Sequence, residues 1–161
     1  MFDVIRWSAE RADAVPDVRA KRFLMDHGLP DGSLLFEADH EESSAFATDS
    51  GAEVMSIGSF DEDFNFFVDI NSGEVLFGLD QDTAPSFTNS SLADFVKCLR
   101  WVDDEFPFYS SEDDSAVKSA AGSRALEFFR SVDPECVSTA DAFWASFVHD
   151  VGIGDYYAGA L

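Results

Sequence analysis

The stretch from Phe64 to Leu99 restricts the possible fold of this chain more than any other part of its sequence. Every second residue from Phe64 to Ile70 is apolar, and this period of two predicts a strand with one buried face. Asn71–Gly73 predicts a tight turn, because glycine adopts a positive φ freely, and Glu74–Leu79 predicts the antiparallel return strand. After a short loop, Ser91–Phe106 has helical apolar spacing that begins at a good N-cap. This order of elements indicates an α+β domain built on an antiparallel meander.

The rest of the chain supplies two further strands and more helices. Caps and apolar spacing predict a helix that Pro16 opens and Gly28 ends, strands over Ser33–Glu37 and Ala52–Phe60, a helix over Ala116–Val132, and a last helix capped by Ser138 and Asp141. Residues 28–32 and the acidic residues 39–44 are predicted as loops. We expect a single domain over residues 1–161, with a mostly antiparallel central sheet and helices packed around it. Residues 1–15 and 152–161 are expected to be loosely ordered.

Charge is distributed unevenly along the chain. It carries 32 acidic residues against 10 basic ones, a net charge of -22, and residues 34–90 hold thirteen acids and no Lys or Arg. Such a field repels nucleic acid and anionic membranes, and it attracts basic surfaces at long range. Two further readings of the charge stay open. The acidity could serve solubility alone, or it could reflect an organism whose proteins are generally acidic, as in halophiles.

Targeting and redox signals are few. The first thirteen residues lack the apolar region of a signal peptide, and no apolar run approaches the roughly 20 residues of a membrane-spanning helix. Cys98 and Cys136 have neither CxxC spacing nor a His partner nearby in the sequence. We therefore expect a cytoplasmic protein with reduced thiols and no membrane contact.

No pattern predicts catalysis, a metal or a cofactor. Asp61-x-Asp63-x-Asn65 begins like a calcium loop, but Phe66 stands where that loop needs Gly and Ser72 where it needs Glu. The three His residues lack metal-ligand spacing, and the chain has no Gly-rich phosphate loop or nucleophile elbow. We expect a protein that is not an enzyme and binds no cofactor.

Several short motifs, taken together in order and spacing, carry a family resemblance. They are Leu29-Pro30, Ile57-Gly58, Val68-Asp69-Ile70-Asn71-Ser72-Gly73-Glu74-Val75, Asn89-Ser90-Ser91-Leu92 with Phe95, Cys98-Leu99 and Phe143-Trp144. On these residues the chain resembles the SUKH superfamily of bacterial immunity proteins, and within it the SUKH-4 type, over about residues 23–150. The segment from Asp39 to Gly51 and the first fifteen residues match nothing in that pattern. The resemblance implies an α+β domain that binds a cognate polymorphic toxin, often a nuclease or deaminase, inside the cell that makes it.

Acidic residues in turns and near helix ends are the candidate contacts with such a partner. Nuclease toxins hold phosphate on basic faces, so an acidic inhibitor can imitate the phosphates and associate rapidly. The candidate acids are Asp61, Glu62, Asp63, Glu74, Asp80, Asp103, Asp104, Glu105, Glu112, Asp113 and Asp114, each with a solvated loop charge as the alternative. Trp101, Phe108 and Tyr109 lie beside these acids in the sequence and are candidate aromatic anchors, with core packing as the alternative.

The sequence therefore predicts an immunity protein that neutralises a toxin by stoichiometric, non-covalent binding. The favoured partner is a nuclease or another nucleic-acid-modifying toxin with a basic surface, and the chain itself is expected to be a monomer that binds no nucleic acid directly. One alternative is an acidic adaptor or DNA mimic that binds a basic endogenous partner. The second alternative is a soluble domain whose charge serves solubility alone.

Overall fold

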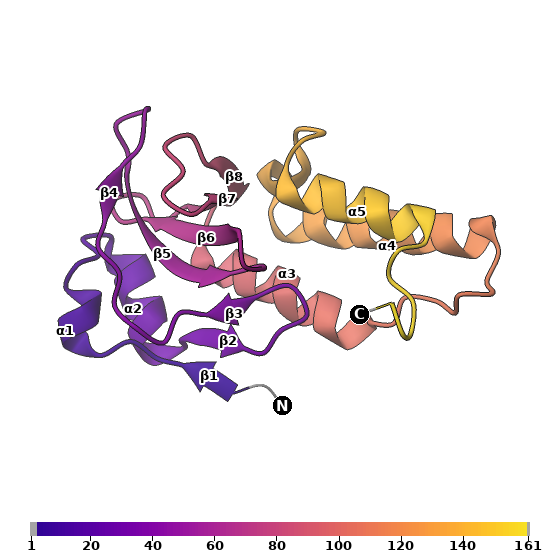
Figure 1. Cartoon of the computed structure of the whole chain (residues 1–161), viewed down its shortest axis with the longest axis horizontal. Helices are drawn as coiled ribbons and strands as arrows, with labels where there is room; N and C mark the ends of the chain where they lie inside the picture. Colours follow the sequence, from indigo (N-terminus) through magenta and orange to yellow (C-terminus); the bar gives the residue numbers. More distant parts are fainter. Residues whose placement is uncertain (1–2, 161) are drawn as a thin grey trace.

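The computed structural model describes residues 3–160 and has the α+β fold that the sequence predicts (Figure 1). The elements are β1 (Asp3–Ile5), α1 (Ala9–Ala12), α2 (Val18–Asp26), β2 (Leu29–Asp31), β3 (Glu37–Ala38), β4 (Phe46–Ala47), β5 (Glu53–Ser59), β6 (Phe64–Asp69), β7 (Val75–Leu79), β8 (Ser86–Asn89), α3 (Leu92–Glu105), α4 (Ser115–Val132), the 3-10 helix η1 (Pro134–Val137) and α5 (Phe143–Ile153). The central sheet has the strand order β3-β5-β6-β7-β8, with β4 also paired to β5. All of its pairs are antiparallel, which confirms the predicted sheet.

The side chains of strand β6 point alternately to the two faces of the sheet. On the inner face, the ring of Phe66 lies 4.8 Å from that of Phe95 in α3 and 5.0 Å from that of Phe143 in α5. On the outer face, Phe67 packs edge-to-face against Phe46 of β4 with ring centroids 5.5 Å apart. Figure 1 shows α3 behind the sheet, α4 and α5 side by side at one end of the molecule, and α1 and α2 at the other. The inner face therefore belongs to the core, and the outer face is left for β4 and the loops around it.

The two ends of the chain are packed where loose order was expected. β1 pairs with β2 in a small separate sheet, and Trp7 and Val15 are buried in the core. At the other end, the ring of Tyr156 lies 4.7 Å from that of Phe147 in α5. Residues at both ends thus contact the rest of the protein, while Met1, Phe2 and Leu161 lie outside the described residues.

The region before the central sheet also differs from its prediction. Helix α2 begins after Asp17, whose carboxylate accepts a hydrogen bond from the backbone N–H of Ala20 over 2.8 Å, so Pro16 stands outside the helix. Residues 28–32, predicted as a loop, contain β2, and most of Ser33–Glu37, predicted as a strand, forms a turn. Strands of two or three residues carry no usable periodicity, and only their pairing partners make them strands.

The prediction for the C-terminal helices is correct for α4 and partly wrong for α5. Helix α4 matches its prediction, but α5 begins after Ala142, which makes no side-chain capping hydrogen bond. Ser138 instead donates its hydroxyl to the Glu135 carbonyl over 2.8 Å at the end of η1, so the expected cap by Ser138 and Asp141 is wrong. A Ser-x-x-Asp pattern predicts a helix start only where the backbone enters a helix there.

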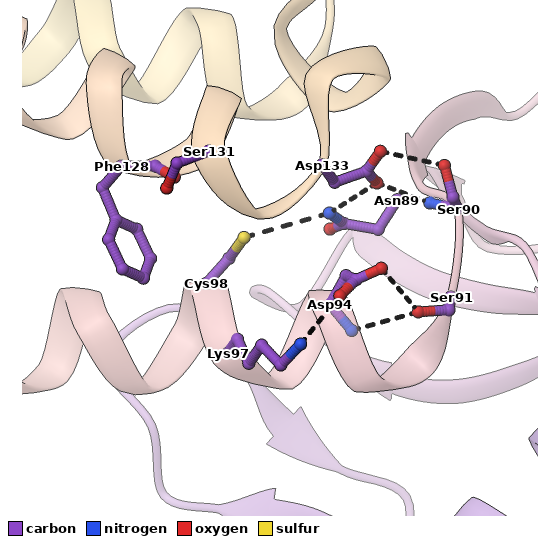
Figure 2. A network of polar contacts seen from close by, with 9 residues as sticks. All are labelled: Asn89, Ser90, Ser91, Asp94, Lys97, Cys98, Phe128, Ser131 and Asp133. Carbon is purple, nitrogen blue, oxygen red and sulfur yellow. Dashed lines mark hydrogen bonds and ion pairs between the residues drawn. The ribbon is translucent and has the colours of Figure 1, made fainter.

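A buried polar network joins the sheet to the C-terminal helices (Figure 2). Asp133, just after α4, is 4% exposed, and its carboxylate accepts hydrogen bonds from the Ser90 backbone N–H over 2.7 Å and the Ser90 hydroxyl over 2.9 Å. The side-chain amide of Asn89 donates to the same carboxylate, and its carbonyl oxygen accepts from the indole N–H of Trp144 in α5 over 2.7 Å. The network holds the end of β8 against both helices.

The two cysteines lie in the same buried region. A hydrogen bond with Cys136, together with burial, raises the pKa of Cys98 far above its ordinary value, so the Cys98 sulfur is a protonated thiol at neutral pH. Cys136 donates to the carbonyl of Phe129 over 3.7 Å. These thiols are packing groups of the core and lack the exposed, electropositive surroundings of reactive cysteines.

Candidate functional site

The outer face of the sheet carries a hollow of about 760 Å³, which we call the acidic groove. Ser56 of β5 and Asn65 of β6 form part of its floor, and the segment from Glu37 to Phe46 forms one side. Asp80 and Gln81, at the end of β7, form another. The groove therefore lies over one end of β5, β6 and β7, on the face that the core helices leave free.

Negative charge dominates the acidic groove. Its lining includes the five carboxylates of Glu37, Asp39, Glu41, Glu42 and Asp80, and it includes no Lys or Arg. The imidazole of His40 is the one other ionisable group in the lining, and its Nε2 lies 3.1 Å from a carboxylate oxygen of Asp31. Five carboxylates around one hollow create a strong local negative potential that attracts a basic surface.

A buried arginine from α1 fixes residues 37–46, which we call the acidic segment, in place. The guanidinium of Arg11 donates to the backbone carbonyls of Asp39 over 3.1 Å and Glu41 over 2.7 Å, and it lies 4.0 Å from the centre of the Trp7 ring. Burial lowers the pKa of Arg11, whereas the carboxylates of Asp39 and Glu42 act in the opposite direction. Because Arg11 bonds to backbone oxygens, it does not occupy the side-chain carboxylates of Glu41 and Glu42, which line the groove.

The carboxylate of Asp39 is held as well. It accepts a hydrogen bond from the Ser56 hydroxyl, and the backbone N–H of Asp39 donates to the carbonyl of Ile57 over 3.0 Å, which continues the pairing of β3 with β5. The Ser43 hydroxyl adds a bond of 3.3 Å to the Ser56 carbonyl. The acidic segment is therefore bound to the sheet at several points and presents a preformed surface.

The structure brings Asp61, Glu62, Asp63 and Asp80 together, as four of the predicted contact residues. Asp61 accepts hydrogen bonds from the backbone N–H groups of Asp63 and Phe64, both at 2.9 Å, so its carboxylate shapes the turn. Glu62 and Asp63 are exposed. The backbone N–H of Asp80 donates to the Asp63 carbonyl over 3.3 Å, which places this acidic turn beside the groove.

The remaining predicted acids lie elsewhere. Glu74 follows the turn at the opposite end of β6 and β7, where it lines a second hollow of about 520 Å³ with Asp49 and Asp69. Glu112, Asp113 and Asp114 lie between α3 and α4, where Asp114 caps α4 and Asp113 accepts from the Ser110 backbone N–H over 2.7 Å. Asp104 and Glu105 are exposed at the end of α3. Since none of these acids lines the acidic groove, the predicted set does not form one surface.

Asp103 is a structural residue. Its carboxylate accepts hydrogen bonds from the Leu34 backbone N–H over 2.8 Å and the Ser33 hydroxyl over 3.1 Å, which fixes the turn before β3 against α3. Burial raises the pKa of Asp103, although these two hydrogen bonds act to lower it. Both oxygens of this carboxylate lie inside the protein, one of them hydrogen-bonded, so Asp103 is not part of the surface that we propose below.

The predicted aromatic anchors belong to the core. Phe108 is 7% exposed and Tyr109 is 6% exposed, and the hydroxyl of Tyr109 donates to the carbonyl of Val151 in α5. The ring of Trp101 stacks on that of Phe128 in α4 with centroids 4.8 Å apart. All three side chains therefore pack in or against the core, because α4 and α5 cover the end of α3 and the residues that follow it.

Four acids of the segment before β4 line the groove without having been predicted as contacts. The sequence pattern places Glu37 at a strand end and Asp39, Glu41 and Glu42 in or beside a loop. The signal available is their density in a part of the chain that has no basic residue. Nothing in the sequence indicates that this segment faces the sheet, because the contact depends on Arg11, far away in sequence.

Other kinds of site find no support within residues 3–160. No group of three or more His, Cys, Asp or Glu residues is placed so that it could hold a metal ion. In the same residues, no helix is both long enough and apolar enough to span a membrane.

The chain matches one protein-family model. That family is described as SUKH-4 immunity protein, and the match covers residues 2–150, nearly the whole chain. No curated protein and no solved structure matches the chain.

Proposed function

The chain belongs to the SUKH-4 family of immunity proteins, and from that premise we propose that it neutralises a nuclease or other nucleic-acid-modifying toxin by covering that toxin's basic substrate face. The acidic groove and the acidic turn beside it form the binding surface. Neutralisation is stoichiometric and non-covalent, and the chain acts as a monomer in the cytoplasm.

The acidic groove is the observation that carries this proposal. Its carboxylates include the exposed Glu37, Glu41 and Glu42, on a segment that Arg11 holds rigidly through its backbone. An enzyme that acts on nucleic acid presents Lys and Arg to phosphate groups, so an acidic surface of this kind complements it. Because the surface is preformed, binding costs little ordering of the chain.

The direct test uses the chain as bait in an extract of the source organism, at low and then at high salt, with mass spectrometry of the bound proteins. We expect a single stoichiometric partner with a C-terminal toxin domain. A spread of basic proteins that all dissociate with salt would contradict the proposal and favour an acidic adaptor or DNA mimic. An empty eluate at both salt concentrations would contradict it in favour of a domain whose charge serves solubility.

A matched pair of bait variants tests the acidic groove itself. Substitution of Glu37, Glu41 and Glu42 by Lys reverses three exposed charges in the groove, whereas substitution of Glu112, Glu127 and Glu135 by Lys reverses three charges outside it. The net charge changes equally in the two variants. Loss of the partner from the first bait alone supports the groove as the binding surface, and equal retention or equal loss in both baits would contradict it.

A further inference from the structure

A third hollow, of about 230 Å³, opens on the inner face of the sheet, at the same end as the acidic groove, and we call it the aromatic hollow. Phe60, Phe64 and Phe77 from the sheet line one side, and α5 contributes the other side. Sites for small molecules usually exceed about 300 Å³. This hollow therefore has room for a single side chain of a partner.

The aromatic hollow is preformed and reaches the surface. The rings of Phe64 and Phe77 are stacked with centroids 5.3 Å apart, and Phe77 lies 4.8 Å from Phe143 of α5. Phe60 is 38% exposed, one of the few large apolar side chains that remain open to solvent. Ring contacts on several sides fix these aromatic faces in position, so a ligand meets a rigid surface.

The aromatic hollow is also negatively charged. Its lining holds Asp150 of α5 and no Lys or Arg, and the Asp150 carboxylate has no hydrogen bond or ion pair to any residue within 3–160. Burial, with the negative charges of Asp150 and Asp155, raises the pKa of Tyr156 to about 12. The acidic turn adds charge at the rim, because the backbone hydrogen bond from Phe60 to Phe64, 2.9 Å long, closes that turn between two lining residues.

We propose that the aromatic hollow receives one arginine side chain of the toxin. A guanidinium is planar and weakly hydrated, so it stacks on aromatic faces while its N–H groups bond to a carboxylate. The aromatic lining of Phe60, Phe64 and Phe77 supplies the ring surface, and Asp150 supplies the carboxylate. Lysine fits less well, because its ammonium group is compact and strongly hydrated. This inference rests on the proposed function for the identity of the partner.

The test is an NMR titration of the full chain with three capped tripeptides, Gly-Arg-Gly, Gly-Lys-Gly and Gly-citrulline-Gly. Citrulline keeps the shape and planarity of arginine and removes its charge. We expect saturable shifts at Phe60, Phe77 and Asp150, with the arginine peptide bound about five-fold more tightly than the citrulline peptide. Asp150→Asn, which keeps the side-chain shape, should reduce the arginine affinity to that of citrulline. Asp155→Asn, a control beside the hollow and outside its lining, should keep the preference.

Equal binding of the arginine and citrulline peptides would overturn the inference, as would an unchanged preference in Asp150→Asn. Arginine shifts that centre on Ser56 and Asn65, in the acidic groove, would overturn it too. The bait experiment is independent of the titration. A captured toxin without arginine selectivity in the peptides leaves the proposed function standing and removes this inference. Arginine selectivity without a captured toxin removes the proposed function and leaves the chemistry of the hollow.

Discussion

The side-chain amide of Asn89 donates a hydrogen bond to the carboxylate of Asp133 over 3.2 Å, across 44 residues of chain. Asn89 is fully buried, and its carbonyl oxygen accepts from the Trp144 indole. One side chain thus satisfies polar groups from two separate C-terminal elements. The position of Asn89 just before α3 is typical of a capping residue, but the cap is Ser91, whose hydroxyl accepts from the Asp94 backbone N–H over 3.1 Å.

Asn89→Ala should destabilise the protein by about 3 kcal/mol, because it leaves the Trp144 N–H and one Asp133 oxygen buried with fewer partners. Urea unfolding followed by circular dichroism measures the free energy of unfolding. Asn71→Ala, in the exposed turn between β6 and β7, is the control and should change it by less than about 0.5 kcal/mol. A loss below about 1 kcal/mol for Asn89→Ala would contradict the role given to this network.

Asp103→Asn should alter the pH dependence of stability. Burial raises the pKa of Asp103 above 3.8, so the folded state keeps a proton that the unfolded state has already lost. The wild-type protein therefore loses folding stability as the pH rises through the raised pKa, whereas the variant has no carboxyl group at position 103 and loses none there. Relative to wild type, the variant should gain stability between about pH 3 and pH 7. Urea unfolding at several pH values measures the difference, and a difference that is constant or moves the other way would refute this assignment.

Arg11→Met should loosen the acidic segment while keeping the apolar contact with Trp7. The hydrogen bonds to the Asp39 and Glu41 carbonyls are lost, and we expect a destabilisation of about 2–4 kcal/mol. Amide hydrogen exchange at Asp39, whose N–H bonds to the Ile57 carbonyl, should become faster. Arg19→Met, at an exposed position in α2, is the control and should leave exchange at Asp39 unchanged.

Charge reversal in the acidic turn should slow association with the captured toxin. Glu62→Lys and Asp63→Lys together should lower the association rate about ten-fold at low salt and much less at high salt, because steering by exposed charges is screened. Asp61 is left intact, since its carboxylate shapes the turn. Stopped-flow kinetics at two salt concentrations measures the effect, and an unchanged rate at low salt would remove this turn from the binding surface.

The parts of the fold that the sequence predicts well are those with long local patterns. β5, β6, β7, α3 and α4 each have enough residues to show a period, and α3 and α4 begin at capping side chains. β1, β2, β4 and β8 have two to four residues each, and their pairing is decided by distant strands. The start of α5 is mispredicted because no side chain caps it.

The candidate site is predictable in its charge and not in its geometry. The acid-rich, base-free stretch indicates a basic partner, and the turn at residues 61–63 is predicted in the right place. The sequence predicts a surface position for Asp103 and leaves Phe108 open between a contact and core packing, because it does not show that Leu34 donates to one and that α5 covers the other. Side chains that face a partner and side chains that face the core differ only in tertiary neighbours.

The first two residues of β6 point to opposite faces of the sheet, Phe64 into the aromatic hollow and Asn65 into the acidic groove. The acidic turn just before them therefore lies between the aromatic hollow on one face and the acidic groove on the other. A flat partner could reach only the acidic turn, whereas a partner with a concave cleft would contact the aromatic hollow and the acidic groove at once. Because enzymes commonly hold their substrates in clefts, a partner that closes on both hollows is consistent with the proposed toxin.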